Sequence, residues 1–286
     1  MKVVNDYIDF EIIDTSDGMK YERWGNIYLL RPDPLVIWNN GDLSLKYHNI
    51  NSIYHRSNKG GGYWEDLKNV PENWSISYHD MKFNLKKMGF KHTGLFPEQA
   101  INWNYIREKI KESKRDNIKV LNLFAYTGGA TIAAMMEGAF VTHVDSSRGM
   151  VSHAKENVKL NHLDETKVRF IIDDVIKFVK REIRRNNKYD AIIMDPPAFG
   201  RGANGEVWDI EKDLYELITL CNELLCDKPL FMLVNSYSGL SPTILYNVLK
   251  LTNKRKGNIS IDEIGLPIKN NDLTLPCGIY GRIDYE

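Results

Sequence analysis

The chain has 286 residues, enough for one large domain and a small one. Its 38 basic and 38 acidic side chains cancel, so no global field attracts nucleic acid and any RNA binding must come from local patches. The three cysteines, Cys221, Cys226 and Cys277, show no metal-ligand spacing, which predicts no metal site and fits a reducing cytosol. The first residues are too charged for a secretory signal, and no apolar run reaches the ~18 residues of a membrane span. We therefore expect a globular cytoplasmic protein.

Residues 1–95 are predicted to form a small β-rich domain, because short runs of β-formers alternate with turn residues. Their aromatic side chains are better explained as filling a thin core than as stacking on bases. A glycine run at 60–62 predicts a loop. The predicted strands are 7–13, 20–24, 27–30, 35–38 and 43–54, followed by a hairpin over 74–85.

Residues 96–286 alternate between strand and helix patterns after a first helix predicted at 99–113. This alternation predicts an α/β Rossmann-like sheet of about seven strands with helices on both faces. The last two strands have no helical pattern between them, which favours an antiparallel closing pair. The predicted strands are 118–124, 139–144, 168–172, 189–194, 230–234, 258–264 and 278–283, and the intervening helices are 130–138, 146–161, 175–185, 209–226 and 242–252.

A turn made of Tyr126-Thr127-Gly128-Gly129 follows the strand at 118–124. The next strand ends in Asp145, 17 residues after Gly128, a spacing that suits a carboxylate on a ribose diol. The turn lacks the three glycines of a dinucleotide fingerprint and the lysine of a P-loop. S-adenosylmethionine, an adenosine ligand without phosphate, fits it best, and its sulfonium cation favours an acidic pocket. NAD binding and a purely structural turn remain alternatives.

Acidic residues end several predicted strands, and the carboxyl ends of parallel strands meet at one edge of a sheet. A single aspartate in this place is usually a helix N-cap, but several of them around one glycine turn favour a ligand site. We predict that Asp145, with Ser146 beside it, accepts hydrogen bonds from the ribose hydroxyls. Asp174 is predicted to accept from the adenine amino group, with the Val175 N–H beside it.

The segment Asp195-Pro196-Pro197-Ala198-Phe199 follows the strand at 189–194. Its two prolines fix the backbone and remove two N–H donors, so nearby carbonyls become rigid acceptors. We predict that Asp195 and the Pro196 carbonyl orient a nucleophilic amine and that Phe199 stacks on a planar base. The polar loop at 200–205 is predicted to form part of the acceptor pocket. The alternative is a rigid exit from the strand.

Three motifs together resemble the class I S-adenosylmethionine-dependent methyltransferases: VLNLFAYTGG at 120–129, DPPAF at 195–199 and GLFPEQ at 94–99. More narrowly, they resemble the branch that contains the large-subunit ribosomal RNA cytosine and guanine methyltransferases. The resemblance covers about residues 90–285 and implies a seven-stranded Rossmann-like fold with an antiparallel last strand. It also implies S-adenosylmethionine as cofactor, a cofactor-covering role for residues 96–99, which include Phe96 and Gln99, and cofactor contacts at Phe124, Tyr126, Gly128, Asp145, Asp174 and Asp195.

One departure from this branch concerns the acceptor. Relatives that make 5-methylcytosine use a cysteine nucleophile after the fifth strand, whereas this sequence has Asn235-Ser236-Tyr237-Ser238 there. Cys277 is the remaining candidate, and a buried thiol is its usual role. We therefore predict a methyltransferase that acts on a nitrogen of an RNA base, with ribosomal RNA as the partner. A protein or small-molecule methyltransferase, a NAD-dependent dehydrogenase and a non-catalytic assembly factor are the alternatives.

Overall fold

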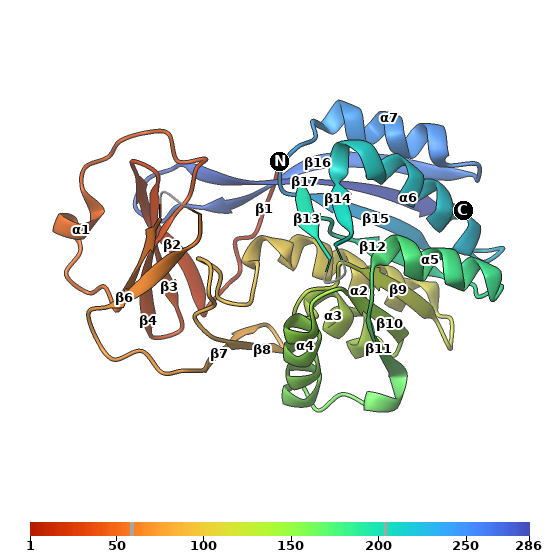
Figure 1. The fold of residues 1–286 in the computed structure, drawn as a ribbon, viewed down its shortest axis with the longest axis horizontal. Coiled ribbons are helices and arrows are strands. Elements are labelled where there is room, and N and C mark those ends of the chain that lie inside the picture. The colour runs from red at the N-terminus through yellow and green to blue at the C-terminus, as the bar shows by residue number, and fades with distance from the viewer. Residues whose placement is uncertain (58–59, 203–204) are drawn as a thin grey trace. The chain divides into compact units, whose positions relative to one another are not determined.

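A computed structural model describes residues 1–57, 60–202 and 205–286 (Figure 1). The chain forms two compact units. The N-terminal unit comprises residues 2–100 and 265–277, and the Rossmann-like unit comprises residue 1 together with 101–264 and 278–286. Among the residues that the structure describes, no helix is both long and apolar enough to cross a membrane.

The N-terminal unit is built on a β-sheet with strand order β2-β3-β4-β5-β6 and a separate hairpin, β7-β8. Neighbouring strands of the sheet are antiparallel except β4 and β5, which run parallel. Trp24 is fully buried and Tyr21 nearly so, as expected for aromatics that fill a core. The strands are β2 (Phe10–Ser16), β3 (Met19–Trp24), β4 (Ile27–Pro32), β5 (Ser52–Arg56), β6 (Gly62–Asp66), β7 (Trp74–Tyr78) and β8 (Met81–Leu85).

Two sequence predictions in this unit are wrong, and the loop predicted at 60–62 holds for Gly60 and Gly61 but not for Gly62. Residues 35–38 are not a strand: the carbonyls of Val36 and Trp38 accept hydrogen bonds from the turn between β2 and β3. Residues 43–54 are not one strand either, because the Asp42 side chain caps a short helix, α1 (Leu43–Lys46), before β5. Gly62 begins β6, where a Cβ would lie 2.1 Å from the His55 carbonyl oxygen. Close strand pairing, which local sequence does not reveal, explains this glycine.

The Rossmann-like unit contains a sheet with order β16-β17-β15-β12-β9-β10-β11, and the two-residue strand β1 (Lys2–Val3) lies at its β16 edge. The neighbours from β15 to β11 are parallel, whereas β17 is antiparallel to β15, as predicted. The strands are β9 (Lys119–Leu123), β10 (Phe140–Asp145), β11 (Val168–Ile172), β12 (Ala191–Met194), β15 (Phe231–Ser236), β16 (Gly257–Pro267) and β17 (Thr274–Tyr285). The helices are α2 (Ala100–Ser113), α3 (Gly129–Met136), α4 (Arg148–Leu160), α5 (Val175–Arg184), α6 (Ile210–Leu224) and α7 (Pro242–Thr252).

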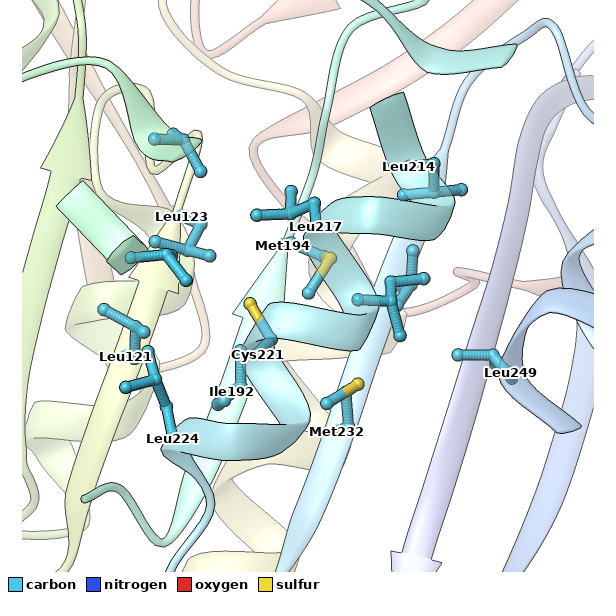
Figure 2. Packing of buried hydrophobic residues seen from close by; sticks show 14 of the residues in the cluster. Leu121, Leu123, Ile192, Met194, Leu214, Leu217, Cys221, Leu224, Met232 and Leu249 are labelled. Carbon is cyan, nitrogen blue, oxygen red and sulfur yellow. The ribbon is translucent and has the colours of Figure 1, made fainter. Parts of the chain in front are cut away.

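A large buried cluster of this unit lies between the sheet and helices α5, α6 and α7. Figure 2 shows Leu217 and Cys221 of α6 beside Met194 and Ile192 of β12. Every second residue of a strand points to this face, so β9 contributes Leu121 and Leu123 while the alternate positions face the other helices. Burial of this apolar surface fixes the strands, and therefore fixes the positions of the loops that follow them.

A hairpin that the sequence did not predict follows β12. It is formed by β13 (Phe199–Arg201) and β14 (Val207–Asp209), which pair antiparallel. The predicted loop at 200–205 is thus partly strand, and its residues 203 and 204 lie outside the described residues. Phe199 is part of this hairpin, so its backbone is held by pairing with Asp209.

Candidate active site

The residues that follow β9 and β12 are hydrogen-bonded to the ends of neighbouring strands at one edge of the sheet. The Ala125 N–H donates to the Val144 carbonyl at 3.0 Å, and the Asp195 N–H donates to the Leu123 carbonyl at 3.3 Å. Strands β10 and β12 lie on either side of β9, so Asp145 and Asp195 flank the glycine turn. The structure therefore brings together the turn and both carboxylates that the sequence analysis selected.

The turn after β9 has a strained backbone. Phe124 and Tyr126 have φ angles of 53° and 48°, and Gly128 has a φ of 90°. Non-glycine residues in this left-handed region cost of order 1–3 kcal/mol each and persist only where their surroundings hold them. The Asp145 carboxylate is one such restraint, because its Oδ2 accepts the Tyr126 N–H at 2.9 Å.

Packing also explains both glycines of the turn. A Cβ on Gly129 would lie 2.8 Å from the ring of Trp103, and a Cβ on Gly128 would lie 3.2 Å from the Cβ of Ala154. The Thr127 side chain is buried, and its carbonyl accepts the Asn157 amide at 2.9 Å. Part of this motif is therefore structural.

A second polar chain lies beside the turn, where a Cβ on Gly128 would be 3.7 Å from the His143 ring. The Asn122 amide donates to Thr131 Oγ1 at 3.0 Å, and Thr131 Oγ1 in turn lies 2.9 Å from His143 Nδ1. The tautomer of the His143 ring decides which of the two groups donates in the Thr131–His143 hydrogen bond. Burial lowers the pKa of His143 to about 3, so this ring is neutral at physiological pH.

Main-chain donors hold both oxygens of Asp145. Its Oδ1 accepts the Ser147 N–H at 2.8 Å, and its Oδ2 accepts from Tyr126. Burial raises the pKa of Asp145, and the two N–H groups oppose this shift. Each oxygen of a carboxylate accepts about two hydrogen bonds, so one lone pair on each remains for a ligand diol. The neighbouring Ser146 is exposed.

Asp173 and Asp174 have different roles at the end of β11. Asp173 forms an ion pair with Arg181. Asp174 is the N-cap of α5, and its Oδ1 accepts the Lys177 N–H at 2.9 Å. The Val175 side chain is buried in the core, so a contribution to a ligand would come from its main-chain N–H, the group that the sequence analysis proposed.

Asp195 is a partly buried carboxyl at this edge of the sheet. Burial raises its pKa to about 6, and the Asn235 amide opposes the shift by donating to Asp195 Oδ1 at 2.7 Å. Pro196 is buried, whereas the Phe199 side chain is 57% exposed. The Pro197 carbonyl accepts the Trp208 indole N–H at 2.7 Å. The segment therefore presents a partly buried carboxyl and an exposed ring on a rigid backbone.

The family model for S-adenosylmethionine-dependent methyltransferase matches residues 48–247, well over half of the chain. This chain belongs to that family. The solved structure of a SAM-dependent methyltransferase from Agrobacterium tumefaciens superposes with a TM-score of 0.93 at 32% identity, covering 99% of this chain and 92% of that chain. The methyltransferase SMU.776, solved in complex with SAH, superposes with a TM-score of 0.74 at 21% identity, a likeness of fold alone.

Two curated relatives of this methyltransferase carry names that include a substrate. Ribosomal RNA large subunit methyltransferase I from Enterobacter sp. (strain 638) is 38% identical over 125 residues, which are 43% of this chain and 30% of that protein. Ribosomal RNA large subunit methyltransferase K/L from Shewanella frigidimarina is 29% identical over 224 residues, 75% of this chain and 29% of that protein. The chain thus spans about 30% of the length of these relatives.

The residues of this chain fit S-adenosylmethionine, the cofactor of its family, by charge. Among the described residues, only burial and neutral donors shift the pKa values of Asp145 and Asp195. Neither carboxylate is therefore neutralised by a lysine or arginine, as suits a site for a sulfonium cation. Within 1–57, 60–202 and 205–286, no group of three side chains has the arrangement of a metal site.

Two predicted cofactor residues belong to the N-terminal unit. Phe96 precedes the 3₁₀ turn Pro97–Gln99, in which the Gln99 N–H donates to the Phe96 carbonyl at 3.1 Å, and both side chains are partly buried. Their cofactor-covering role stays a prediction. Cys277 is buried, and burial together with the negative charge of Glu98 raises its pKa well above the usual value, so it is an inert thiol.

The sequence analysis missed two partners of the DPPAF motif. Asn235 was placed at a strand end but given no role, and Trp208 was not singled out. Both belong to segments far from Asp195 in the sequence, and the hydrogen bonds that they form depend on strand order and on the β13–β14 hairpin. Only the position of Asn235 after a strand could have suggested it.

Proposed function

We propose that this chain transfers the methyl group of S-adenosylmethionine to a nitrogen of an RNA base, with ribosomal RNA as the substrate. The observation that carries this proposal is the partly buried Asp195 carboxyl with its raised pKa, followed by two prolines that fix the backbone and then by the exposed Phe199 ring. A planar acceptor that stacks on Phe199 would bring a ring or exocyclic nitrogen to Asp195. The names of the two curated relatives support RNA as the acceptor, and that substrate would place the protein in the cytoplasm.

The roles of the site residues follow from their chemistry. When bound, S-adenosylmethionine supplies an electrophilic methyl group on a positively charged sulfur. We assign Asp145 to the ribose hydroxyls and Asp174 to the adenine amino group. Asp195 and the Pro196 carbonyl accept N–H hydrogen bonds from the acceptor nitrogen, which fixes the direction of its lone pair, and Asp195 takes up the proton that the nitrogen loses. Positioning of this kind supplies most of the rate effect in a direct transfer.

Nitrogen is favoured over carbon because no suitable thiol is present where one would be needed. Methylation at the C5 of a pyrimidine requires a thiolate to add to the ring first. The segment after β15 carries Asn235 and Ser236 instead of cysteine, and Cys277 is a buried thiol with a raised pKa. A Cys277→Ser variant should therefore keep its activity.

The acceptor is tested by incubating the full chain with methyl-labelled S-adenosylmethionine and ribosomal RNA from cells that lack the protein. We expect label in the RNA and an N-methylated nucleoside by mass spectrometry after digestion. Label in a protein or small-molecule fraction, with none in RNA, would replace the RNA proposal by the alternative acceptor class. A 5-methylcytidine product, lost in Cys277→Ser, would contradict the assignment of a nitrogen.

A further inference from the structure

Four polar side chains form a continuous hydrogen-bonded chain that ends at Asp195. Arg282 Nη2 donates to Asn102 Oδ1 at 3.0 Å, and Asn102 Nδ2 donates to Asn235 Oδ1 at 3.3 Å. Asn235 Nδ2 then donates to Asp195 Oδ1 at 2.7 Å. The four residues come from β17, α2, β15 and the end of β12, and all lie in the Rossmann-like unit.

The direction of this chain is set by its two ends. A guanidinium only donates hydrogen bonds and an ionised carboxylate only accepts them, whereas each amide has one side that donates and one that accepts. Arg282 therefore requires the oxygen of Asn102 on its side, which turns the NH₂ group of Asn102 toward Asn235. The Asn235 NH₂ group must then face Asp195. With both amides reversed, an oxygen would face Asp195, and only a protonated Asp195 could donate to it.

Arg282 is well fixed for this task. Its guanidinium carbon lies 4.0 Å from the ring centre of Tyr105 and 3.8 Å from that of Tyr280, and Nη2 also lies 3.3 Å from the Ile101 carbonyl oxygen. A guanidinium stays charged in proteins, so its donor role does not change with pH. Two carboxylates, Asp284 and Glu108, interact electrostatically with the Arg282 guanidinium. Asp284 also accepts from the Tyr105 hydroxyl at 2.8 Å and pairs with Lys109 at 2.9 Å.

We propose that Arg282 is a positioning residue for methyl transfer, which acts through Asn102 and Asn235 to keep the Asp195 carboxylate ionised and directed at the acceptor nitrogen. This inference rests on the role proposed above for Asp195. The Asn235 amide is important for the charge of Asp195. In the described part of the chain, burial raises the pKa of this carboxyl, and the Asn235 amide is the one group that opposes the increase. Reversing that one amide would replace a donor by an acceptor, and the protonated acid cannot accept the proton of the incoming N–H.

Two variants remove the ordering of the amides by different means. Arg282→Met removes the group that orders the chain. Asn102→Asp keeps Arg282 paired but supplies no donor to Asn235, whose NH₂ group then turns toward the new carboxylate and away from Asp195. Lys109→Met is the matched control, because it removes a positive charge from α2, the helix that carries Asn102, and leaves all four residues of the chain in place. Arg282→Lys keeps a donor-only side chain and should restore the order in part.

The closing experiment measures the Asp195 carboxyl by ¹³C NMR in the full chain labelled at aspartate, assigned with Asp195→Asn, alongside the pH profile of kcat. We expect the titration midpoint, near pH 6 in the wild type, to rise by about one to two pH units in Arg282→Met and Asn102→Asp. The lower limb of the kcat profile should move with it, while Lys109→Met leaves both in place and Arg282→Lys lies between.

Circular dichroism and SAH binding establish that each variant is folded. An unchanged midpoint in both folded variants would overturn the proposal, as would an equal shift in Lys109→Met, which would indicate a through-space charge effect. The carboxyl titration does not require turnover. If the wild type methylates no RNA, the proposed function fails, whereas the titration still decides whether Arg282 controls Asp195.

Discussion

Asp145 and Asp195 follow the two strands on either side of β9, yet they keep their charge by different means. Both side chains are partly buried. Main-chain N–H groups from the loop after β10 and from the glycine turn hold both oxygens of Asp145. Asp195 precedes two prolines that offer no N–H, so its recorded donor is the side chain of Asn235. The charge of a carboxylate held by backbone N–H groups depends on the local fold, whereas the charge of one held by a side chain depends on residues distant in the sequence.

This difference suits the two proposed tasks. A group that binds a ribose diol needs a constant charge, which fixed backbone donors provide. A group that takes a proton from an acceptor nitrogen needs a pKa closer to neutrality, and burial in a site with a single neutral donor provides that. We therefore expect the two carboxylates to have separate functions, as they have separate hydrogen-bond donors.

The largest expected effect is on turnover in Asp195→Asn. The asparagine amide has the same shape as the carboxylate, but it has no negative charge and cannot take up the proton of the substrate N–H. We therefore expect kcat to fall by about 100- to 1000-fold. The affinity for SAH, measured by calorimetry, should change far less. Asp190→Asn is the control, because Asp190 lies just before β12, at the other end of the same strand, and pairs with Arg115. An equal loss of kcat in both variants would remove the special role of Asp195.

The same variant should make the protein more stable at high pH. Burial raises the pKa of Asp195 from its ordinary 3.8 to about 6, so its contribution to stability is present at low pH and is lost as pH rises through 6. Asp195→Asn removes that loss, which corresponds to about 3 kcal/mol of unfolding free energy. Urea unfolding at pH 8 and pH 4 measures it: the gain should appear at pH 8 and vanish at pH 4. A gain independent of pH would mean that Asp195 is not a buried ionised group.

How far the sequence could predict these features differs between the two carboxylates. Asp145 and the glycine turn are adjacent parts of one strand–helix–strand unit, so their spacing was enough to predict that they meet. The same local periodicity predicted the parallel strands and the antiparallel β17. Asn235, Asn102 and Arg282 come from three separate elements. No spacing connects them, and only the packed sheet brings their polar atoms into line.

The errors in the N-terminal unit have a related cause. Residues 35–38 have the composition of a strand, but their carbonyls pair with a turn, and the cap formed by Asp42 competes with strand formation in residues 43–46. The β13–β14 hairpin was missed because its pairing forms across a glycine-rich connection. A hydrogen bond to a separate turn decided the first case, whereas a local side-chain cap and a local hairpin pairing decided the other two.

A smaller effect is expected for Asp145→Asn, which should weaken SAH binding by about 10- to 100-fold. The amide loses the charge-assisted bonds to the ribose, worth about 1.5–3 kcal/mol each, and one of its ends can no longer accept a backbone N–H. Asp173→Asn is the control at the next strand end, since Asp173 pairs with Arg181 and has no proposed ligand role. Titration calorimetry gives both dissociation constants. An unchanged value for Asp145→Asn would take Asp145 out of the cofactor site.

The smallest expected effect separates packing from ligand approach at the glycine turn. A Cβ on Gly129 would lie 2.8–2.9 Å from three atoms of the Trp103 ring, so Gly129→Ala should cost about 1–3 kcal/mol of unfolding free energy. Gly149→Ala is the matched control near the start of α4: the nearest atom is Ser147 Oγ at 3.9 Å, and alanine should stabilise that helix slightly. Urea unfolding measures both variants. If Gly129→Ala were as stable as the wild type but bound SAH poorly, the glycine would be there for the cofactor, and the packing of Trp103 would not be the reason for it.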